Sequence, residues 1–199
     1  MRILVIGATG TIGKAVLAAL GGRHEIIPAS RQKAREKVDI ADLASLRALL
    51  ERVGRVDAIV SAAGNAAWKP LAKLTDEDFA FSVANKLMGQ VNVARYGFAQ
   101  VNDGGSITLS AGVLAQQPMP GSAAVSLVNA GLEGFTRAAA LEAPRGIRVN
   151  VVSPPWVAET LKAMGQDPSR GLPAADVARA YVQSVEGKER GQVISPRVA

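Results

Sequence analysis

The sequence predicts an α/β protein of the doubly wound type, with a mainly parallel, seven-stranded sheet and helices on both of its faces. Short aliphatic segments, which are typical of buried parallel strands, alternate along the chain with longer segments of helical periodicity. Hydrophobic residues make up 48% of the chain and aromatic residues only 4%, and such small, aliphatic side chains let helices pack closely on a sheet. The length of 199 residues fits one such domain, so we expect a single domain over residues 1–199.

Seven segments are expected to form strands, because they are short, rich in β-branched residues and bounded by turn residues. They cover residues 2–6, 25–29, 37–40, 56–61, 106–110, 148–152 and 192–195. The stretch 102–105, Asn-Asp-Gly-Gly, is expected to form a turn before the fifth of them.

Five segments are expected to form helices between these strands. They cover residues 12–20, 43–53, 76–101, 123–142 and 174–186. Asp42 is the expected N-cap of the second helix, and Thr75 that of the third, which has an acidic first turn and a possible break near Ala84. Strict alternation of strands and helices predicts parallel strands joined by crossover helices.

A glycine-rich turn connects the first strand to the first helix. Gly7 permits the tight turn, Gly10 lets a pyrophosphate approach the backbone, and Gly13 allows close contact between helix and strand. The pattern alone is compatible with a plain turn, but its place between strand and helix predicts a Rossmann fold that binds a dinucleotide. The expected cofactor contacts in this turn are Gly7, Thr9, Gly10, Thr11, Ile12 and Gly13.

The residues after the second strand favour NADP over NAD. An acidic residue at this place binds the ribose 2′-hydroxyl of NAD, whereas the sequence has Ser30 and Arg31. A guanidinium can form two hydrogen bonds with a 2′-phosphate, and a hydroxyl can donate a third. The alternative is a solvated basic loop, since Lys33, Arg35 and Lys37 follow closely.

Composition and charge argue against several other functional classes for this protein. The net charge of +6 comes from dispersed basic residues without interleaved aromatic residues, so we expect no nucleic-acid binding. The chain has no cysteine and one histidine, His24, and so neither disulfides nor a histidine-rich metal site is expected. No apolar run reaches the roughly 18–20 residues that cross a bilayer. We therefore expect a cytoplasmic protein that binds neither metal nor membrane.

Further segments, taken with the glycine turn, resemble the short-chain dehydrogenase/reductase family over nearly the whole chain. They are Asp39-Ile40, Ser61-Ala62-Ala63-Gly64, the helical stretch Gly131-Leu132-Glu133-Gly134-Phe135-Thr136-Arg137, Asn150-Val151-Val152-Ser153-Pro154 and Gly191-Gln192-Val193-Ile194. The resemblance implies hydride transfer between a nicotinamide and a carbonyl or alcohol carbon. It also implies cofactor contacts from Asp39, Ile40, Ala62, Ala63, Gly64, Asn129 and Pro154.

The resemblance fails at the residues that complete this chemistry. The family uses a tyrosine to transfer the proton, a lysine four residues later, a serine after the fifth strand and an asparagine on an earlier helix. Here Val125 replaces the tyrosine and Asn129 the lysine, while Lys86 stands at the asparagine position and Gly112 near that of the serine. The sequence resembles a small bacterial subgroup that lacks the usual active-site residues.

Three polar residues are candidates for a catalytic role in an altered site. Lys86 could donate a proton or face an anionic substrate, Ser110 could donate a hydrogen bond to a carbonyl oxygen, and Asn129 could bind the nicotinamide ribose. An exposed helical lysine, a strand-end serine and a satisfied buried amide are the structural alternatives. Trp68 and Trp156 fall in loops that either line a substrate pocket or are simply anchored by these rings.

Two functions are favoured by the sequence, and non-redox chemistry on the same scaffold is a third alternative. One is an NADP-dependent oxidoreductase that acts on a small carbonyl or alcohol through an altered active site; the other is a non-catalytic NADP-binding sensor or scaffold protein. A homodimer or homotetramer is expected, because the two long helices carry many small residues, among them Ala138, Ala139 and Ala140. Internal packing would account for those small residues as well.

Overall fold

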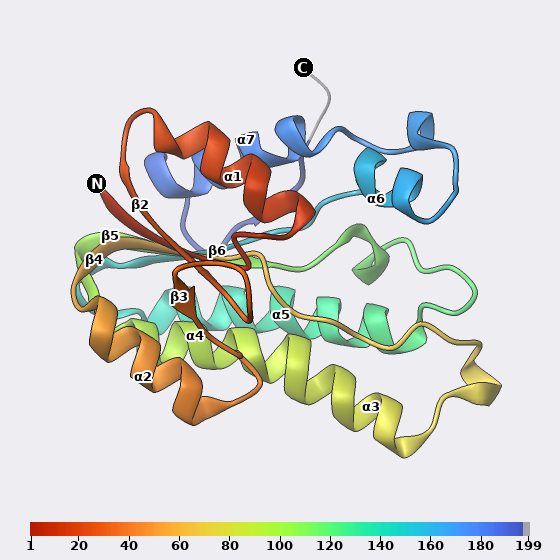
Figure 1. The fold of residues 1–199 in the computed structure, drawn as a ribbon. Coiled ribbons are helices and arrows are strands. Elements are labelled where there is room, and N and C mark those ends of the chain that lie inside the picture. The colour runs from red at the N-terminus through yellow and green to blue at the C-terminus, as the bar shows by residue number, and fades with distance from the viewer. Residues whose placement is uncertain (197–199) are drawn as a thin grey trace.

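A computed structural model describes residues 1–196 and confirms the predicted fold: a seven-stranded parallel sheet with helices on both faces (Figure 1). The strand order is β3-β2-β1-β4-β5-β6-β7. The strands are β1 (Arg2–Ile6), β2 (Glu25–Ser30), β3 (Glu36–Lys37), β4 (Val56–Ser61), β5 (Val101–Ser110), β6 (Arg148–Val152) and β7 (Val193–Ile194). The central strands are almost fully buried, which explains why they are aliphatic on both faces.

The helices form one layer on each side of the sheet, and each layer has its own core. α1 (Thr11–Gly21) and α7 (Ala174–Glu186) cover one face, and α2 (Leu43–Val53), α4 (Gly89–Gly97) and α5 (Ala123–Glu142) cover the other (Figure 1). α3 (Asp76–Ser82) leads into α4, and the short α6 (Ala158–Ala163) follows β6. Strands β2 and β3 lie on one side of β1, and β4 to β7 follow on its other side. Doubly wound folds bind ligands at such a switch point in strand order, here between β1 and β4.

Three predicted elements differ from the structure by more than one residue at an end. The third strand is Glu36–Lys37 rather than 37–40, because the following residues turn toward α2. The expected helix over 76–101 ends at Gly97 and contains a π-helical segment, Val83–Met88, close to the expected break. The stretch 102–105 belongs to β5, which begins at Val101 with an irregular register opposite β4.

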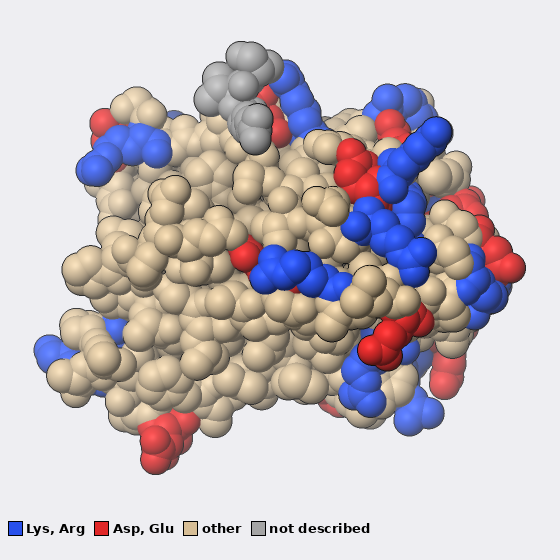
Figure 2. Space-filling view, turned by 180° about the vertical axis from the view of Figure 1, so that it is seen from behind, with Lys and Arg blue, Asp and Glu red and all other residues tan. Residues whose placement is uncertain are grey.

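Charged side chains gather at the end of the molecule where the strands begin. Ion pairs at that end join Arg2 to Glu25 (3.3 Å) and Arg145 to Asp103 (2.7 Å). Figure 2 shows such side chains crowded at the right-hand end of the rear face, while most of the remaining face is uncharged.

Within residues 1–196 no helix is long and apolar enough to cross a membrane. The cytoplasmic location stays a prediction.

Candidate active site

A groove of about 260 Å³ lies at the carboxyl ends of the strands, at the switch point between β1 and β4. Ten of the residues expected to bind the cofactor line it: Gly7, Thr9, Gly10, Ser30, Arg31, Asp39, Ile40, Ala62, Ala63 and Gly64. Thr11, Ile12 and Gly13 lie next to them, in the first turn of α1. Asn129 and Pro154 line a separate, adjacent pocket. The structure thus brings most of the expected set to one groove.

The glycine turn is shaped as a phosphate cradle. Gly7 has φ +84°, and a Cβ there would lie 2.5 Å from the carbonyl oxygen of Ala62. A Cβ on Gly13 would lie 2.0 Å from the carbonyl oxygen of Gly7, whereas one on Gly10 would make only an ordinary van der Waals contact with that oxygen, at 3.4 Å. Gly10 also caps α1 without a side chain, so the first N–H groups of the helix are available to an anion. These features fit a pyrophosphate.

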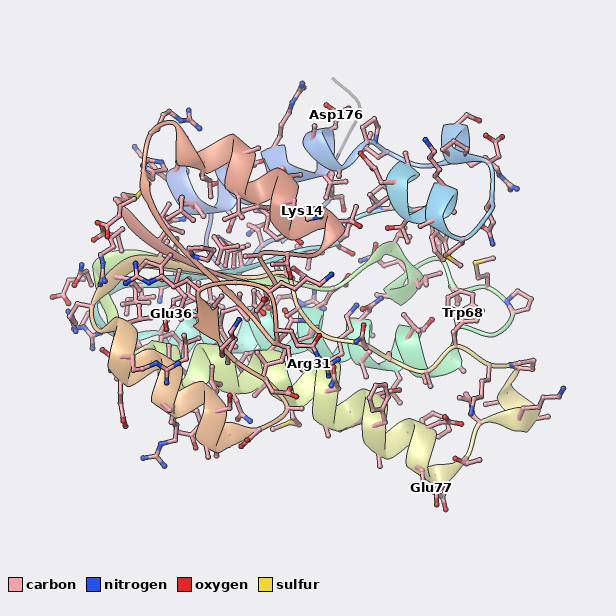
Figure 3. The ribbon with its side chains drawn as sticks, in the orientation of Figure 1. Lys14, Arg31, Glu36, Trp68, Glu77 and Asp176 are labelled. Carbon is pink, nitrogen blue, oxygen red and sulfur yellow. The ribbon has the colours of Figure 1, made fainter. Side chains whose placement is uncertain are left out.

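The far end of the groove carries Arg31, the basic residue that is expected to favour NADP over NAD. Arg31 lies on the loop after β2 (Figure 3), and its side chain is 63% exposed. Its guanidinium is 3.9 Å from the Asp39 carboxylate, a weak contact that leaves most of its N–H donors free. The Ser30 hydroxyl accepts hydrogen bonds from the N–H groups of Lys33 and Ala34 and so shapes this loop. Its own proton remains available for donation.

A smaller pocket of about 160 Å³ adjoins the groove and holds two of the three candidate catalytic residues. Lys86, from the π-helical segment, and Asn129, from α5, both line it, as does Val125 at the position of the family's tyrosine. Lys86 Nζ donates to the carbonyl oxygen of Ala111, and Asn129 Nδ2 to that of Gly112, both at 3.3 Å. The two side chains therefore converge on successive carbonyls of the loop after β5.

Lys86 is held in place by an unusual segment and a close loop. A π-helical turn shifts the side chains that follow it around the helix axis, and such turns are frequent at functional sites. Gly64, with φ +123°, comes so close that a Cβ on it would lie 3.0 Å from Lys86 Cα and 3.1 Å from Cγ. Burial lowers the pKa of the Lys86 ammonium from 10.5 to about 8. No carboxylate of residues 1–196 forms an ion pair with it.

Asn129, which lines the same pocket, has a buried acceptor without a partner within residues 1–196. Its side chain is only 1% exposed, and its Oδ1 has no hydrogen-bond partner within the described part of the chain. Leaving a buried carbonyl oxygen unpaired costs about 1–3 kcal/mol, so a ligand hydroxyl or amide would be stabilised there. This position suits a nicotinamide ribose, which is what the resemblance implied for it.

Ser110 does not join Lys86 and Asn129, and the expected grouping of the three is corrected on this point. Its hydroxyl is 2.6 Å from the hydroxyl of Tyr181 on α7 and donates to the carbonyl oxygen of Ser61, also at 2.6 Å. Side chains of a strand alternate between its two faces; Ser110 therefore points to the α1–α7 layer, like Thr108, which contacts Ser184. Lys86 and Asn129 lie on the opposite side of the sheet.

Some contacts around the site could not be predicted from the sequence. Asn65 and Asn85 line the groove, where Asn85 Oδ1 accepts from the Asn65 N–H at 2.8 Å. Glu133, 5% exposed, accepts two bonds from Gln116 Nε2 and one from Ser153 Oγ, which ties α5 to the loops after β5 and β6. Only the folded chain brings these pairs together. A larger hollow of about 510 Å³, between α7 and β7, contains none of the expected residues.

Comparisons with known proteins agree with this geometry. The profile of the family described as Enoyl-(Acyl carrier protein) reductase matches residues 18–194. The crystal structure of the protein lin1944 from Listeria innocua is 40% identical with a TM-score of 0.95, over 99% of this chain and 100% of that one. The structure of a small-chain dehydrogenase in complex with NADPH is 27% identical with a TM-score of 0.87, over 98% and 95% of the two chains.

Curated relatives are similar over a part of their length. Hydroxynaphthalene reductase arp2 from Aspergillus fumigatus is 33% identical over 132 residues, which cover 64% of this chain and 48% of that protein. The uncharacterized oxidoreductase C922.06 from Schizosaccharomyces pombe is 32% identical over 169 residues, 76% and 65% of the two chains. The chain thus spans from slightly less than half to about two thirds of the length of these relatives. From the profile match and the shared fold, the chain belongs to the short-chain dehydrogenase/reductase family.

Proposed function

We propose that this protein is an NADP-dependent reductase of carbonyl compounds in which Lys86 takes over the proton transfer that the family's tyrosine performs. The observation that carries the proposal is the convergence of Lys86 and Asn129 in one pocket beside the dinucleotide groove. The names of relatives, a hydroxynaphthalene reductase and an oxidoreductase, are consistent with this reaction class.

The groove and pocket fit NADPH, which when bound supplies the hydride that reduces the carbonyl carbon. The glycine turn and the N-terminus of α1 hold the pyrophosphate, and Arg31 binds the 2′-phosphate. Lys86 Nζ gives a proton to the carbonyl oxygen, so that an alcohol forms and the neutral amine is reprotonated by water. Asn129 Oδ1 accepts a hydrogen bond from a ribose hydroxyl. Val125 keeps the pocket apolar.

The pH dependence of reduction tests the role of Lys86. With its pKa at about 8, Lys86 is protonated at neutral pH, and only the protonated form can act as an acid. With saturating NADPH, we expect kcat/KM for a reduced carbonyl compound to be constant below pH 8 and to fall about tenfold per pH unit above it. Lys86→Gln should remove most of the activity together with this pH dependence.

A different outcome would favour the second candidate function. If NADPH binds but no member of a panel of ketones and aldehydes oxidises it, in single-turnover as in steady-state measurements, the reductase proposal fails. Val125 at the tyrosine position is the observation that keeps a non-catalytic NADP-binding sensor or scaffold as the alternative. That alternative expects oligomeric state or partner binding to respond to NADPH.

The preference for NADP rests on Arg31 and can be tested by calorimetry. Because a guanidinium–phosphate pair forms two charge-assisted hydrogen bonds, Arg31→Ala should weaken NADPH binding by about 10- to 100-fold and leave NADH binding unchanged. Arg35→Ala is the matched control, since Arg35 is exposed on the same loop but does not line the groove. Tighter binding of NADH than NADPH by the unaltered protein would contradict the assignment.

We also propose a homodimer or homotetramer assembled through α5. One exposed stripe of this helix combines the small and apolar residues Leu127, Ala130, Gly134, Ala138 and Leu141 with one charged residue, Arg137. Leu141 is 84% exposed, and a Cβ on Gly134 would meet no atom within 4 Å, so a second copy can approach closely. Ala130→Glu should shift the protein to monomers in light scattering, whereas Ala44→Glu on α2 should not. Equal masses for both variants and the unaltered protein would exclude this interface.

A further inference from the structure

Among the described residues, Lys86 is the only ionisable one that lines the smaller pocket beside the dinucleotide groove. The other lining side chains, from the loop after β5, α5, the loop after β6 and α6, are apolar except for Asn129, Thr160 and the ring N–H of Trp156. Lys86 is partly buried, and no carboxylate within residues 1–196 forms an ion pair with its ammonium. Because charges held away from water in proteins are normally paired, this cation indicates that the pocket binds an anion.

The hydrogen-bond donors of Lys86 are only partly used inside the protein. An ammonium group has three N–H donors, and the carbonyl oxygen of Ala111, at 3.3 Å from Nζ, is the one acceptor that it contacts within residues 1–196. Two donors therefore remain for a ligand. A 2-oxo acid has two acceptor oxygens on neighbouring carbons, one on the carbonyl group and one on the carboxylate, so a single ammonium can bind both.

The size and the charge of the pocket favour a small ligand with a single negative charge. Its volume of about 160 Å³ is below the roughly 300–1,000 Å³ of sites for drug-sized ligands. A phosphate group carries a charge of about −1.5 to −2 at pH 7, which one ammonium does not neutralise, and Lys86 does not line the groove that fits the pyrophosphate. Burial lowers the pKa of Lys86 to about 8, so the desolvation of its ammonium is already part of the folded protein, and a carboxylate adds an attraction that is stronger here than in water.

We infer that the substrate is a short 2-oxo acid whose carbonyl oxygen and carboxylate both accept hydrogen bonds from Lys86 Nζ. The carbonyl carbon receives the hydride of NADPH, and its oxygen receives the proton of Lys86. A 2-hydroxy acid and NADP⁺ form, and water reprotonates the amine. Apolar side chains such as Val125 and Val113 suit the short alkyl group of such an acid. This inference rests on the proposed function and narrows its carbonyl compounds to carboxylates.

Oxamate, an analogue of a 2-oxo acid in which an amide replaces the ketone, tests the site without turnover. Calorimetry would compare it with oxamide, which has nearly the same shape and no charge, in the free protein and with saturating NADP⁺. At pH 7 oxamate should bind about 30-fold more tightly or better. Its Kd should be constant below pH 8 and rise about tenfold per pH unit above it, because only the protonated form of Lys86 carries a charge. Equal Kd values for the two compounds, or no binding of oxamate in either form of the protein, would overturn the inference.

Variants locate the anion within the molecule. Lys86→Gln should raise Kd for oxamate about 30-fold or more and remove its pH dependence, while Kd for oxamide stays within a few-fold. Lys86→Met should give the same result, so a folding defect of one variant leaves the test intact. Lys162→Gln is the matched control, because Lys162 is exposed on α6, the helix that carries Thr160, but does not line the pocket. An effect of the control as large as that of Lys86→Gln would mean that oxamate binds the basic surface in general and would also overturn the inference.

The readouts separate this inference from the proposed function. Pyruvate and 2,3-butanedione both have two neighbouring carbonyl carbons and the same number of heavy atoms, but only pyruvate is charged. If oxamate binds at Lys86 and neither compound oxidises NADPH, the anion site is supported and only the reductase proposal fails. If 2,3-butanedione oxidises NADPH and pyruvate does not, the reductase is supported and the 2-oxo acid is refuted.

Discussion

Replacing Lys86 by methionine is expected to abolish carbonyl reduction and, at pH 7, to raise the free energy of unfolding by about 2–3 kcal/mol. Burial lowers the pKa of Lys86 from 10.5 to about 8, and each pKa unit corresponds to about 1.4 kcal/mol of preference for the neutral form. Methionine keeps the stem that contacts Gly64 without a charge, and because Lys86 is only partly buried, the expected gain is smaller than the full pKa difference would give. Urea unfolding at pH 7 and an NADPH oxidation assay measure the two effects.

The stability gain should depend on pH in a defined direction. Between pH 8 and 10.5 the unfolded chain holds a proton on Lys86 that the folded chain has released, so the stability of the unaltered protein rises with pH in this window. The advantage of Lys86→Met is therefore complete below pH 8 and lost as the pH approaches 10.5. Lys14→Met, at an exposed lysine of α1 labelled in Figure 3, is the control. A variant that is less stable than the unaltered protein at pH 7 would contradict the argument.

Gly13→Ala is expected to lower the free energy of unfolding by about 3 kcal/mol and to remove NADPH binding. The added Cβ would lie 2.0 Å from the carbonyl oxygen of Gly7 and 2.9 Å from Ala8 Cα. Both atoms belong to the backbone of the phosphate cradle, so the turn itself has to move, and such overpacking costs about 1–3 kcal/mol or more. Thermal unfolding and calorimetry with NADPH give the two readouts.

Gly21→Ala provides the matched control within the same helix. A Cβ on Gly21, the last residue of α1, meets no atom within 4 Å. This variant should therefore bind NADPH normally and be as stable as the unaltered protein or more stable by up to about 1 kcal/mol. If the two alanine variants had the same stability and NADPH affinity, helix propensity rather than the close contact at Gly13 would determine the effect of the substitution.

Local sequence patterns predicted most of the fold and of the dinucleotide groove. The glycine turn and Ser30-Arg31 lie at the ends of strands, and parallel strands place such residues at one edge of the sheet. The contact of Asp39-Ile40, which was expected inside the third strand, was predicted only from the family resemblance. The predicted elements were wrong where tertiary contacts override the local conformational preference of the residues. The third strand is shorter than expected, because only Glu36 and Lys37 pair with β2, and the stretch 102–105 joins β5 despite its turn composition.

The sequence by itself determined the fold class, the place of the cofactor groove and the loss of the family's tyrosine and lysine at Val125 and Asn129. Only the tertiary structure decided which polar residues meet there. Ser110 turns toward Tyr181 because side chains alternate along a strand. Lys86 reaches the pocket of Asn129 because a π-helical turn and Gly64 fix its stem there. The pKa of its ammonium is lowered by burial, and burial depends on neighbours that are distant in the sequence.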